Sequence, residues 1–285
     1  MDRMIRCITS DGAIMAAAVD TTNIVAIAQE LHHTSGVATA ALGRLLSGAS
    51  LMGAMLKKEQ AALTMKINGG GPLGSVVAIG DSHGNVRGYV EHPEVELPLK
   101  PNGKLDVGGG VGRDGLLMVV RDLGEGEPYV GQVRIVTGEI AEDITAYYAI
   151  SEQIPTVCAL GVLVDKEEHR AMLSGGLLIQ VLPGADSATI DKLEENIRSL
   201  EPVTTMLAKG MTMEEICQKA LFGFEMEILD EYQVKYVCTC SRDKVVQAFS
   251  TLKREDIVSL ADETGYAEAS CQYCGKKYRF SVEEL

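Results

Sequence analysis

The sequence is poor in aromatic residues: its 285 residues include no tryptophan and only four phenylalanines. A hydrophobic core must therefore be built mainly from aliphatic side chains and methionine. The hydrophobic fraction of 46% and the charged fraction of 23% are ordinary for a folded globular protein, which excludes a wholly disordered chain. A chain of this length is near two domains and can bury a sizeable core without disulfides.

Positive charge is also scarce. The chain carries 26 Lys and Arg against 40 Asp and Glu, so its formal net charge is −14. Because this charge repels a phosphate backbone unless positive side chains gather locally, we do not expect nucleic acid to be the main partner.

Long apolar runs are absent. A membrane-spanning helix needs about 20 apolar residues, but Arg44 interrupts residues 34–56, and Glu152 and Pro155 interrupt residues 144–164. We therefore expect no transmembrane helix and no membrane partner. The first seven residues carry charges where a signal peptide needs its apolar stretch, which predicts a cytoplasmic protein. In that reducing compartment the seven cysteines are by default thiols or metal ligands.

Up to about residue 184 the chain consists of short segments rich in β-branched residues, set between turn signals. The turns at residues 82–85 and 101–103 favour antiparallel pairing of neighbouring strands. Two helices are expected, at residues 22–33 and 35–58. The expected strands are residues 4–9, 14–19, 62–67, 76–80, 86–91, 115–121, 129–137, 156–164 and 177–182.

The helix expected at residues 35–58 has almost no polar face. A helix that is apolar on all sides is normally buried. Its glycines at positions 36, 43, 48 and 53 each cost roughly 1 kcal/mol of helix propensity relative to alanine, but they allow strands to approach closely. The sequence thus predicts an α+β fold, in which a mixed, largely antiparallel sheet core covers a buried helix on more than one side.

Past residue 184 the pattern becomes helical. A first amphipathic helix is indicated by three- and four-residue spacing of Ile190, Leu193, Ile197 and Leu200. A second is expected to begin at Thr212, because Glu215 follows at the spacing of a capping box. We expect three parts: an α/β core domain at residues 1–184, a helical linker at 185–231, and a small C-terminal domain at 232–285 that holds four of the seven cysteines and needs a staple to fold.

These four cysteines form two close pairs, Cys238 with Cys240 and Cys271 with Cys274. Four thiolates are the preferred ligands of structural zinc, because soft sulfur donors and a tetrahedral shell suit the ion. The second pair has the usual spacing of a zinc knuckle, whereas a pair with one intervening residue is much less common in purely structural sites. The sequence therefore predicts one Zn²⁺ bound by four thiolates.

Basic residues surround the pairs in an otherwise acidic chain. A zinc ion with four thiolates carries a formal charge of −2, which positive neighbours stabilise while they lower thiol pKa values. The basic residues are Lys235, Arg242, Lys244, Lys276, Lys277 and Arg279. The same residues leave open a zinc-containing nucleic-acid-binding protein, although no row of aromatic residues accompanies them.

The cysteines alone leave two hypotheses open: a structural zinc site and a redox switch. A disulfide across one intervening residue closes a small ring that is easily reduced, which suits signalling. Oxidation of both pairs would remove every metal ligand. Because zinc binding in small domains is coupled to folding, with apparent energies of order 10–16 kcal/mol, loss of the ion should unfold the domain.

At these residues the chain closely resembles the heat-shock protein 33 family of bacterial holdase chaperones. The likeness lies in the cysteine motifs at residues 238–242 and 271–275, and in residues 151–156 and 175–183 of the core. The resemblance implies a protein without enzymatic activity that is inactive when reduced and zinc-bound. On oxidation it would bind unfolding client proteins without ATP and prevent their aggregation.

The resemblance also implies the disulfides, Cys238 with Cys240 and Cys271 with Cys274. Zinc would leave, residues 232–285 would act as the redox-switch domain, and this domain and the linker would lose order. Activated family members are expected to form homodimers.

Three further cysteines depart from this scheme. Cys7 and Cys158 lie in apolar strand patterns and Cys217 in a helix, so we expect buried, inert thiols.

Other candidate motifs carry little chemistry. The five histidines have no metal-ligand spacing. The glycine runs at 69–71 and 108–110 are expected to be turns or loops, because neither run is followed by a Lys-Ser or Lys-Thr pair and a helix, as a phosphate-binding loop would be. A zinc-dependent thiol oxidoreductase is the enzymatic alternative, but Cys271 lies too near the chain end for a thioredoxin-like motif.

Overall fold

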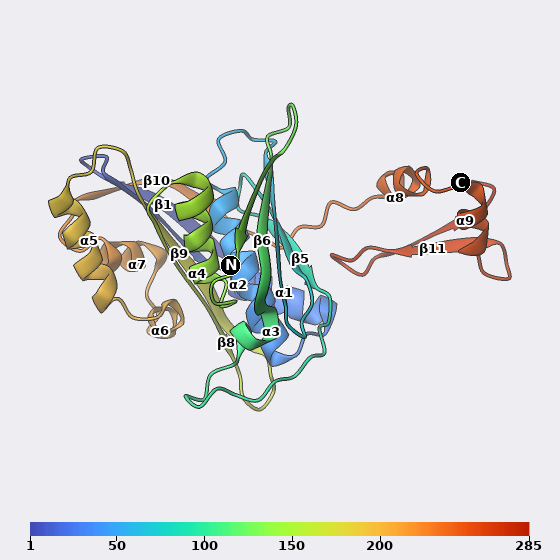
Figure 1. Cartoon of the computed structure of the whole chain (residues 1–285), viewed down its shortest axis with the longest axis horizontal. Helices are drawn as coiled ribbons and strands as arrows, with labels where there is room; N and C mark the ends of the chain where they lie inside the picture. Colours follow the sequence, from blue (N-terminus) through green and yellow to red (C-terminus); the bar gives the residue numbers. More distant parts are fainter. Residues whose placement is uncertain (285) are drawn as a thin grey trace. The chain divides into compact units, whose positions relative to one another are not determined.

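The computed structural model describes residues 1–284. It divides into two compact units, of which the first spans Met1–Tyr236 and the second begins at Val237. The first unit contains two sheets and a long helix between them (Figure 1). Within the described part of the chain, no helix is both long and apolar enough to cross a bilayer.

Both sheets of the first unit are five-stranded and antiparallel. The first sheet has the order β10-β1-β2-β9-β8, with β1 at Arg3–Thr9, β2 at Ile14–Asp20, β8 at Thr156–Val164, β9 at Ala171–Val181 and β10 at Met226–Gln233. The second sheet has the order β5-β4-β3-β6-β7, with β3 at Ala62–Gly70, β4 at Val76–Asp81, β5 at Val86–Val90, β6 at Gly112–Asp122 and β7 at Tyr129–Arg134. All strands expected from the sequence are therefore present.

Helix α2 (Gly36–Gly53) lies between the sheets, beside α1 (Thr22–His32). Its first turn is capped by Ser35, whose hydroxyl accepts the N–H of Ala38. Every residue of α2 except Arg44 is buried, and its core cluster includes side chains of both sheets. The expectation of a buried helix covered on more than one side is confirmed. The helix ends five residues before the expected position 58, which leaves Lys57 and Lys58 exposed outside it.

Glycines allow the backbone of α2 to touch the backbone of β4. A Cβ atom on Gly53 would lie 2.4 Å from the carbonyl oxygen of Asp81, and one on Gly80 would lie 2.3 Å from that of Ala49. Neither contact leaves room for a methyl group, because backbone cannot rotate away as a side chain can. Glycine is therefore required on both sides of this contact.

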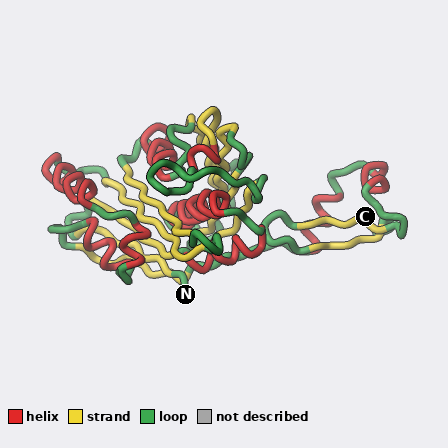
Figure 2. The backbone as a smooth tube through the Cα atoms, turned by 90° about the horizontal axis from the view of Figure 1, so that it is seen from below, coloured by secondary structure: helices red, strands yellow, loops and turns green. Residues whose placement is uncertain are grey.

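Helices α5 (Ser187–Ser199), α6 (Val203–Ala208) and α7 (Met213–Ala220) cover the opposite face of the first sheet (Figure 2). Their buried residues, among them Leu193, Met206 and Ile216, share a hydrophobic cluster with β1, β2 and β9. The capping box is confirmed, since Thr212 and Glu215 exchange side-chain to backbone hydrogen bonds of 3.3 and 2.8 Å. The expected linker helices thus dock on the core, and the division into core, linker and switch domain stays a prediction about function.

Strand β10 departs from the expectation, because the sequence predicts a helical linker up to residue 231. Half of its eight residues, MEILDEYQ, are acidic or amide-bearing and give little strand signal. Pairing with β1 forms the strand, and ion pairs across the two strands join Arg3 to Glu231 and Arg6 to Asp230. The partner strand, rather than local propensity, determines this element.

Short helices α3 (Val107–Val111) and α4 (Ala141–Tyr147) and a π-helical turn (Tyr148–Glu152) were also not expected. The glycine run at 108–110 lies in α3, where a loop was expected, because Asp106 and Glu139 accept the N–H groups of Gly109 and Gly108 at 3.0 and 3.1 Å. Asp143, with both oxygens on backbone N–H groups at 2.8–3.0 Å, holds the start of α4 in the same way. Side-chain caps thus stabilise α3 and α4.

The second unit consists of α8 (Arg242–Phe249), α9 (Arg254–Ser259) and an antiparallel hairpin of β11 (Tyr266–Ser270) and β12 (Lys277–Ser281). Its hydrophobic core has only five buried residues, which are Phe249, Ile257, Ala267, Tyr278 and Phe280. A core this small does not stabilise a fold by itself, so the unit needs a further constraint.

We expect Gly53→Ala to lower the free energy of unfolding of the first unit by about 1–3 kcal/mol, because the clash with Asp81 exceeds the gain in helix propensity. Gly36→Ala in the same helix is the matched control, since its nearest contact would be an ordinary 3.4 Å. Urea unfolding followed by circular dichroism measures both. Equal midpoints for the two variants would show that the backbone contact is not a constraint.

Candidate metal centre

The sulfur atoms of Cys238, Cys240, Cys271 and Cys274 all lie within 4.8 Å of one another. Two of the separations join the two motifs: Cys238 Sγ lies 3.6 Å from Cys271 Sγ, and Cys240 Sγ lies 3.5 Å from Cys274 Sγ. Tetrahedral zinc with bonds of about 2.3 Å would hold its sulfurs about 3.8 Å apart. The four side chains are therefore grouped as a set of metal ligands, and they could hold a soft metal ion.

A tight turn between β11 and β12 positions Cys271 and Cys274. The N–H of Gly275 donates to the carbonyl of Cys271 at 2.8 Å, and the N–H of Cys271 donates to the carbonyl of Lys276 at 3.0 Å. Gly275 has a φ of 69°, in the left-handed region that favours glycine. This turn aims both thiols to the same side, as the knuckle spacing in the sequence predicts.

The loop that carries Cys238 and Cys240 is fixed by the start of α8. Ser241 caps this helix by accepting the N–H of Lys244, and the ammonium of Lys244 donates back to the carbonyl of Thr239 at 2.9 Å. Arg242 lies over the ring of Phe280, with its guanidinium carbon 4.0 Å from the ring centre. The loop is thereby anchored to α8 and to the small core.

Tyr278 connects this core to the sulfurs. Its ring belongs to the core, and its hydroxyl donates to Cys240 Sγ at 3.1 Å. This hydrogen bond lowers the pKa of Cys240 to about 7, while burial raises the pKa of Cys238 to about 12 and raises the pKa of Cys274. In the reduced protein without a metal, Cys240 is thus the easier thiol to ionise, and metal binding must displace protons from the more buried ones.

The basic residues act differently from the expectation. Several pair with carboxylates within the second unit: Lys277 with Glu268, Arg279 with Asp262 and Arg242 with Glu284. The largest effect on the pKa of Cys240 comes instead from the Tyr278 hydroxyl. No sequence pattern points to Tyr278, because its role depends on the register of the β11–β12 hairpin.

The three other cysteines lie in the first unit. Cys7 and Cys217 are fully buried, as expected, whereas Cys158 is half-buried. Burial still raises the pKa of Cys158, and contact with Cys7 raises the pKa of Cys217. High pKa values keep both thiols protonated and unreactive. Among the described residues, the group at Cys238 is the one whose Cys, His or carboxylate ligand atoms gather closely enough for a metal ion.

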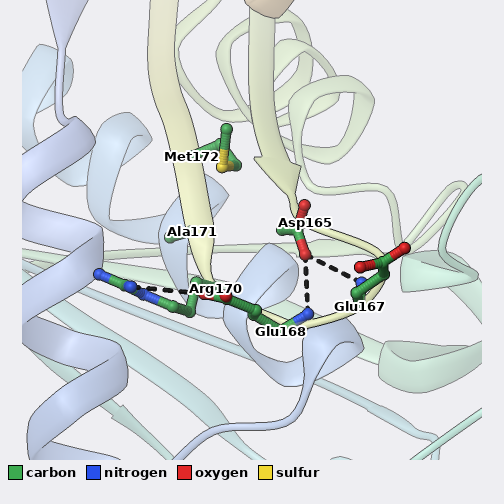
Figure 3. A pocket seen from close by; sticks show the side chains of 6 residues that line it. All are labelled: Asp165, Glu167, Glu168, Arg170, Ala171 and Met172. Carbon is green, nitrogen blue, oxygen red and sulfur yellow. Dashed lines mark hydrogen bonds and ion pairs between the residues drawn. The ribbon is translucent and has the colours of Figure 1, made fainter.

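A hollow of about 420 Å³ at the turn between β8 and β9 offers no comparable chemistry (Figure 3). The Asp165 carboxylate accepts the N–H groups of Glu167 and Glu168 at 2.9 and 2.7 Å, and both hydrogen bonds are exposed. Glu168 also pairs with Arg170 at 3.4 Å. These groups satisfy one another within the turn.

Comparison with known proteins finds relatives along nearly the whole chain. The profile of the family described as "Hsp33 protein" matches residues 2–281. A "33 kDa chaperonin" of Acetivibrio thermocellus is 46% identical over 284 residues, covering 100% of this chain and 95% of that protein. A "33 kDa chaperonin" of Clostridioides difficile is 44% identical over 284 residues, covering 100% of this chain and 97% of that protein. A crystal structure of the 33 kDa chaperonin (Heat shock protein 33 homolog) of Thermotoga maritima has a TM-score of 0.91 and 35% identity, covering 99% of this chain and 95% of that one.

We expect the reduced protein to bind about one zinc ion per chain, and Cys274→Ser to weaken that binding sharply, because a hydroxyl is a poor ligand beside three thiolates. Removal of the ion should also unfold the second unit. Metal analysis and protease sensitivity measure the two effects, with Cys158→Ser as a control that removes a thiol from the first unit. Full zinc retention in a variant lacking all four clustered cysteines would overturn the assignment.

Proposed function

The chain belongs to the Hsp33 family, and we propose that it is a molecular chaperone whose holdase activity is switched by oxidation of the four clustered cysteines. The observation that carries the proposal is the gathering of Cys238, Cys240, Cys271 and Cys274 within 4.8 Å in a unit with very little core of its own. In the reduced state these thiolates bind one Zn²⁺, and the ion supplies the constraint that the small unit needs.

Oxidation removes this constraint. Two thiolates give two electrons to an oxidant such as hydrogen peroxide, which takes up two protons and leaves as two waters while one disulfide forms. The resemblance to the family pairs Cys238 with Cys240 and Cys271 with Cys274. After two such steps none of the four sulfurs remains a thiolate, so zinc is released and the second unit loses order.

Strand β10 is the route by which this loss reaches the linker. It follows α7 in the chain and ends four residues before the second unit begins at Val237. As an edge strand it pairs with β1 alone and relies in part on charged contacts, such as Arg6 with Asp230. Edge pairing of this kind is easily lost from its end. Fraying of β10 would loosen α5–α7, whose docked faces are apolar.

The exposed apolar surface binds unfolding client proteins and prevents their aggregation without ATP. The proposal includes a cytoplasmic location, a homodimer in the oxidised state and no role for nucleic acid or membranes. A thiol oxidoreductase is less well supported, because a redox Cys-x-x-Cys motif lies at the start of a helix, and here Cys271 and Cys274 lie in a turn between two strands. Nucleic-acid binding is disfavoured by the carboxylate partners of Lys277 and Arg279.

Light scattering by a thermally denaturing client tests the proposal. We expect no protection by the reduced, zinc-bound protein, and strong protection, without ATP, by protein treated with peroxide at mildly denaturing temperature. The variant lacking all four clustered cysteines separates the switch from general effects of peroxide, since its activity should not respond to oxidation. Equal protection by reduced and oxidised wild-type protein would contradict a redox switch.

A second prediction concerns the linker. Leu193 lies on the buried face of α5 and is 3% exposed. Leu193→Asp therefore places a charge against the first sheet and should loosen α5 while zinc remains bound. We expect partial chaperone activity without oxidation, increased binding of a hydrophobic dye and faster linker proteolysis. Ser187→Asp adds the same charge at an exposed position in the first turn of α5 and should behave as wild type. Unchanged dye binding, proteolysis and client protection in Leu193→Asp would exclude this mechanism.

A further inference from the structure

Strand β8 is the second edge of the first sheet, and the hydrogen bonds show which of its backbone groups face outward. The carbonyl of Pro155 accepts the N–H of Val181 in β9, whereas the N–H of Cys158 donates away from β9, to Thr145 Oγ1 at 3.3 Å. Because antiparallel pairing alternates along a strand, the N–H and C=O groups of Leu160 and Val162 also face away from the sheet. Neither N–H group has a partner on that side among the described residues.

A groove of about 630 Å³ runs along this edge. Its walls come from β8 and the turn that follows it, from residues 96–105, from α2, from the start of α4 and from the first turn of α6. A side chain at Gly161 would lie 2.7 Å from Thr204, so one face of β8 packs against α6. On the other face Val162 packs against Gly43 of α2. The edge is therefore recessed between helices, and Leu97, Leu99 and Leu105 add apolar surface opposite it.

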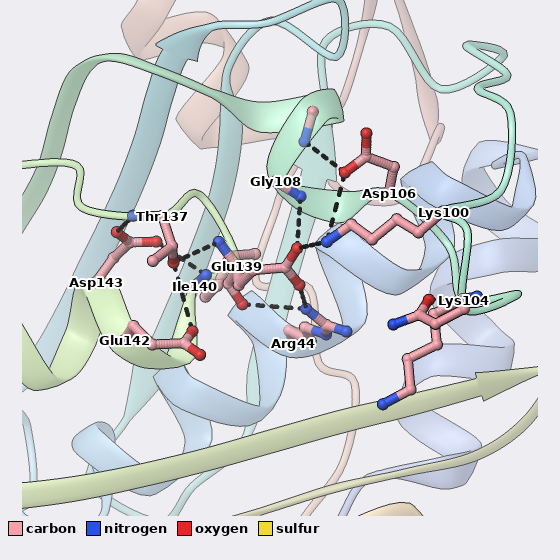
Figure 4. Close-up of polar contacts among 12 residues, drawn as sticks. Arg44, Lys100, Lys104, Asp106, Gly108, Thr137, Glu139, Ile140, Glu142 and Asp143 are labelled. Atoms are coloured by element: carbon pink, nitrogen blue, oxygen red, sulfur yellow. Dashed lines mark hydrogen bonds and ion pairs between the residues drawn. The ribbon is translucent and has the colours of Figure 1, made fainter.

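One buried polar group beside the groove lacks a partner. Arg44 lines the groove, and its Nη1 donates to the carbonyl and the carboxylate of Glu139 at 3.2 and 2.6 Å (Figure 4). Glu139 also binds Lys100 and the N–H of Gly108, so its acceptor capacity is used. The Nε atom of Arg44 is the one buried side-chain nitrogen or oxygen of the described residues that has no hydrogen bond. Because this nitrogen is itself enclosed by protein, it is not offered to a ligand in the groove, and the inference rests on the outward backbone groups of β8.

We infer that this groove binds an extended, largely apolar peptide segment, which adds to β8 as a new antiparallel or parallel strand. Strand addition satisfies the outward backbone groups of β8, while pockets along the groove take alternate side chains. The inference rests on the proposed function in one respect, since the natural ligand would be a segment of an unfolding client. A single extended chain enters a recessed edge, whereas the β8 edge of a second folded copy would carry its own walls and meet those of the first.

The groove consists only of residues of the first unit and includes none of the clustered cysteines. Peptide binding in the groove is therefore independent of the oxidation state of the clustered cysteines. Exposure of the apolar faces of the linker helices, in contrast, depends on it. A groove of this size holds a short segment, so its affinity alone does not retain a client, and it acts as an accessory site beside the oxidation-dependent surface.

The test measures fluorescence anisotropy of a labelled eight-residue peptide of alternating valine and threonine against the full-length protein. We expect binding that is equal within about twofold for reduced and oxidised wild-type protein. Val162→Pro removes an outward N–H while leaving the pairing with β9 intact, because proline is tolerated at edge positions. It should weaken binding at least tenfold. Val162→Ala loses the same side chain but keeps the N–H, and should change affinity less than threefold.

A peptide methylated on alternate backbone nitrogens provides the matched control on the ligand, and it should bind at least tenfold more weakly than the unmodified peptide. Circular dichroism and thermal melting verify that both variants are folded. Equal binding by Val162→Pro and Val162→Ala, or no binding by folded wild-type protein, would overturn the inference. So would a dimer that is lost in Val162→Pro without any peptide binding, because β8 would then pair with a second copy.

These results are distinguishable from a failure of the proposed function. If oxidised protein protects a client equally well with Val162→Pro and the peptide does not bind, the groove is wrong and the holdase stands. If the peptide binds as expected but oxidation brings no protection of a client, the groove stands as a peptide site and the redox-regulated holdase is wrong.

Discussion

The contact between the backbones of α2 and β4 constrains the whole first unit. With no side chain at Gly53 or Gly80, the helix approaches the second sheet closely enough for the first sheet to pack on its other side. The first sheet in turn presents its far face to α5–α7, whose apolar residues pack against it. Each layer therefore depends on the one inside it, and the stability of the outermost helices is derived from packing rather than from their own propensity.

The second unit is constrained in a different way. Its five buried core residues are linked to the sulfur cluster through Tyr278, which contributes its ring to the core and its hydroxyl to Cys240. Loss of the cluster geometry would therefore disturb the core, and loss of the core would remove a hydrogen bond from the cluster. This coupling gives a unit that is ordered or disordered as a whole, which suits a switch. The first unit, whose core contains none of the clustered cysteines, has no such dependence.

Sequence patterns predicted what depends on local residue order. The continuous apolar pattern of α2, the β-branched segments between turn signals and the spacing within each cysteine pair concern neighbours in the chain. The structure has the helix, the strands and the cysteine cluster at these positions. Elements formed by distant partners were missed. Strand β10 depends on β1, α3 depends in part on the carboxylate of Glu139, and the Tyr278 contact depends on hairpin register. The recessed edge of β8 arises only when α2, α6 and residues 96–105 come together.

Under the proposed function and the inferred peptide groove, the first unit would carry two apolar binding surfaces with different controls. The surface beneath α5–α7 is covered in this structure, whereas the groove along β8 is open. Two weak sites on one rigid scaffold bind a single flexible chain more tightly than either does alone, because binding at one site raises the effective concentration of the chain at the other. Opening the surface beneath α5–α7 would then allow the protein to retain a client that otherwise contacts the β8 groove only transiently. An oxidation-dependent gain in client affinity would then need no change at the groove itself, since the proposed switch would alter only the number of sites that one client can reach.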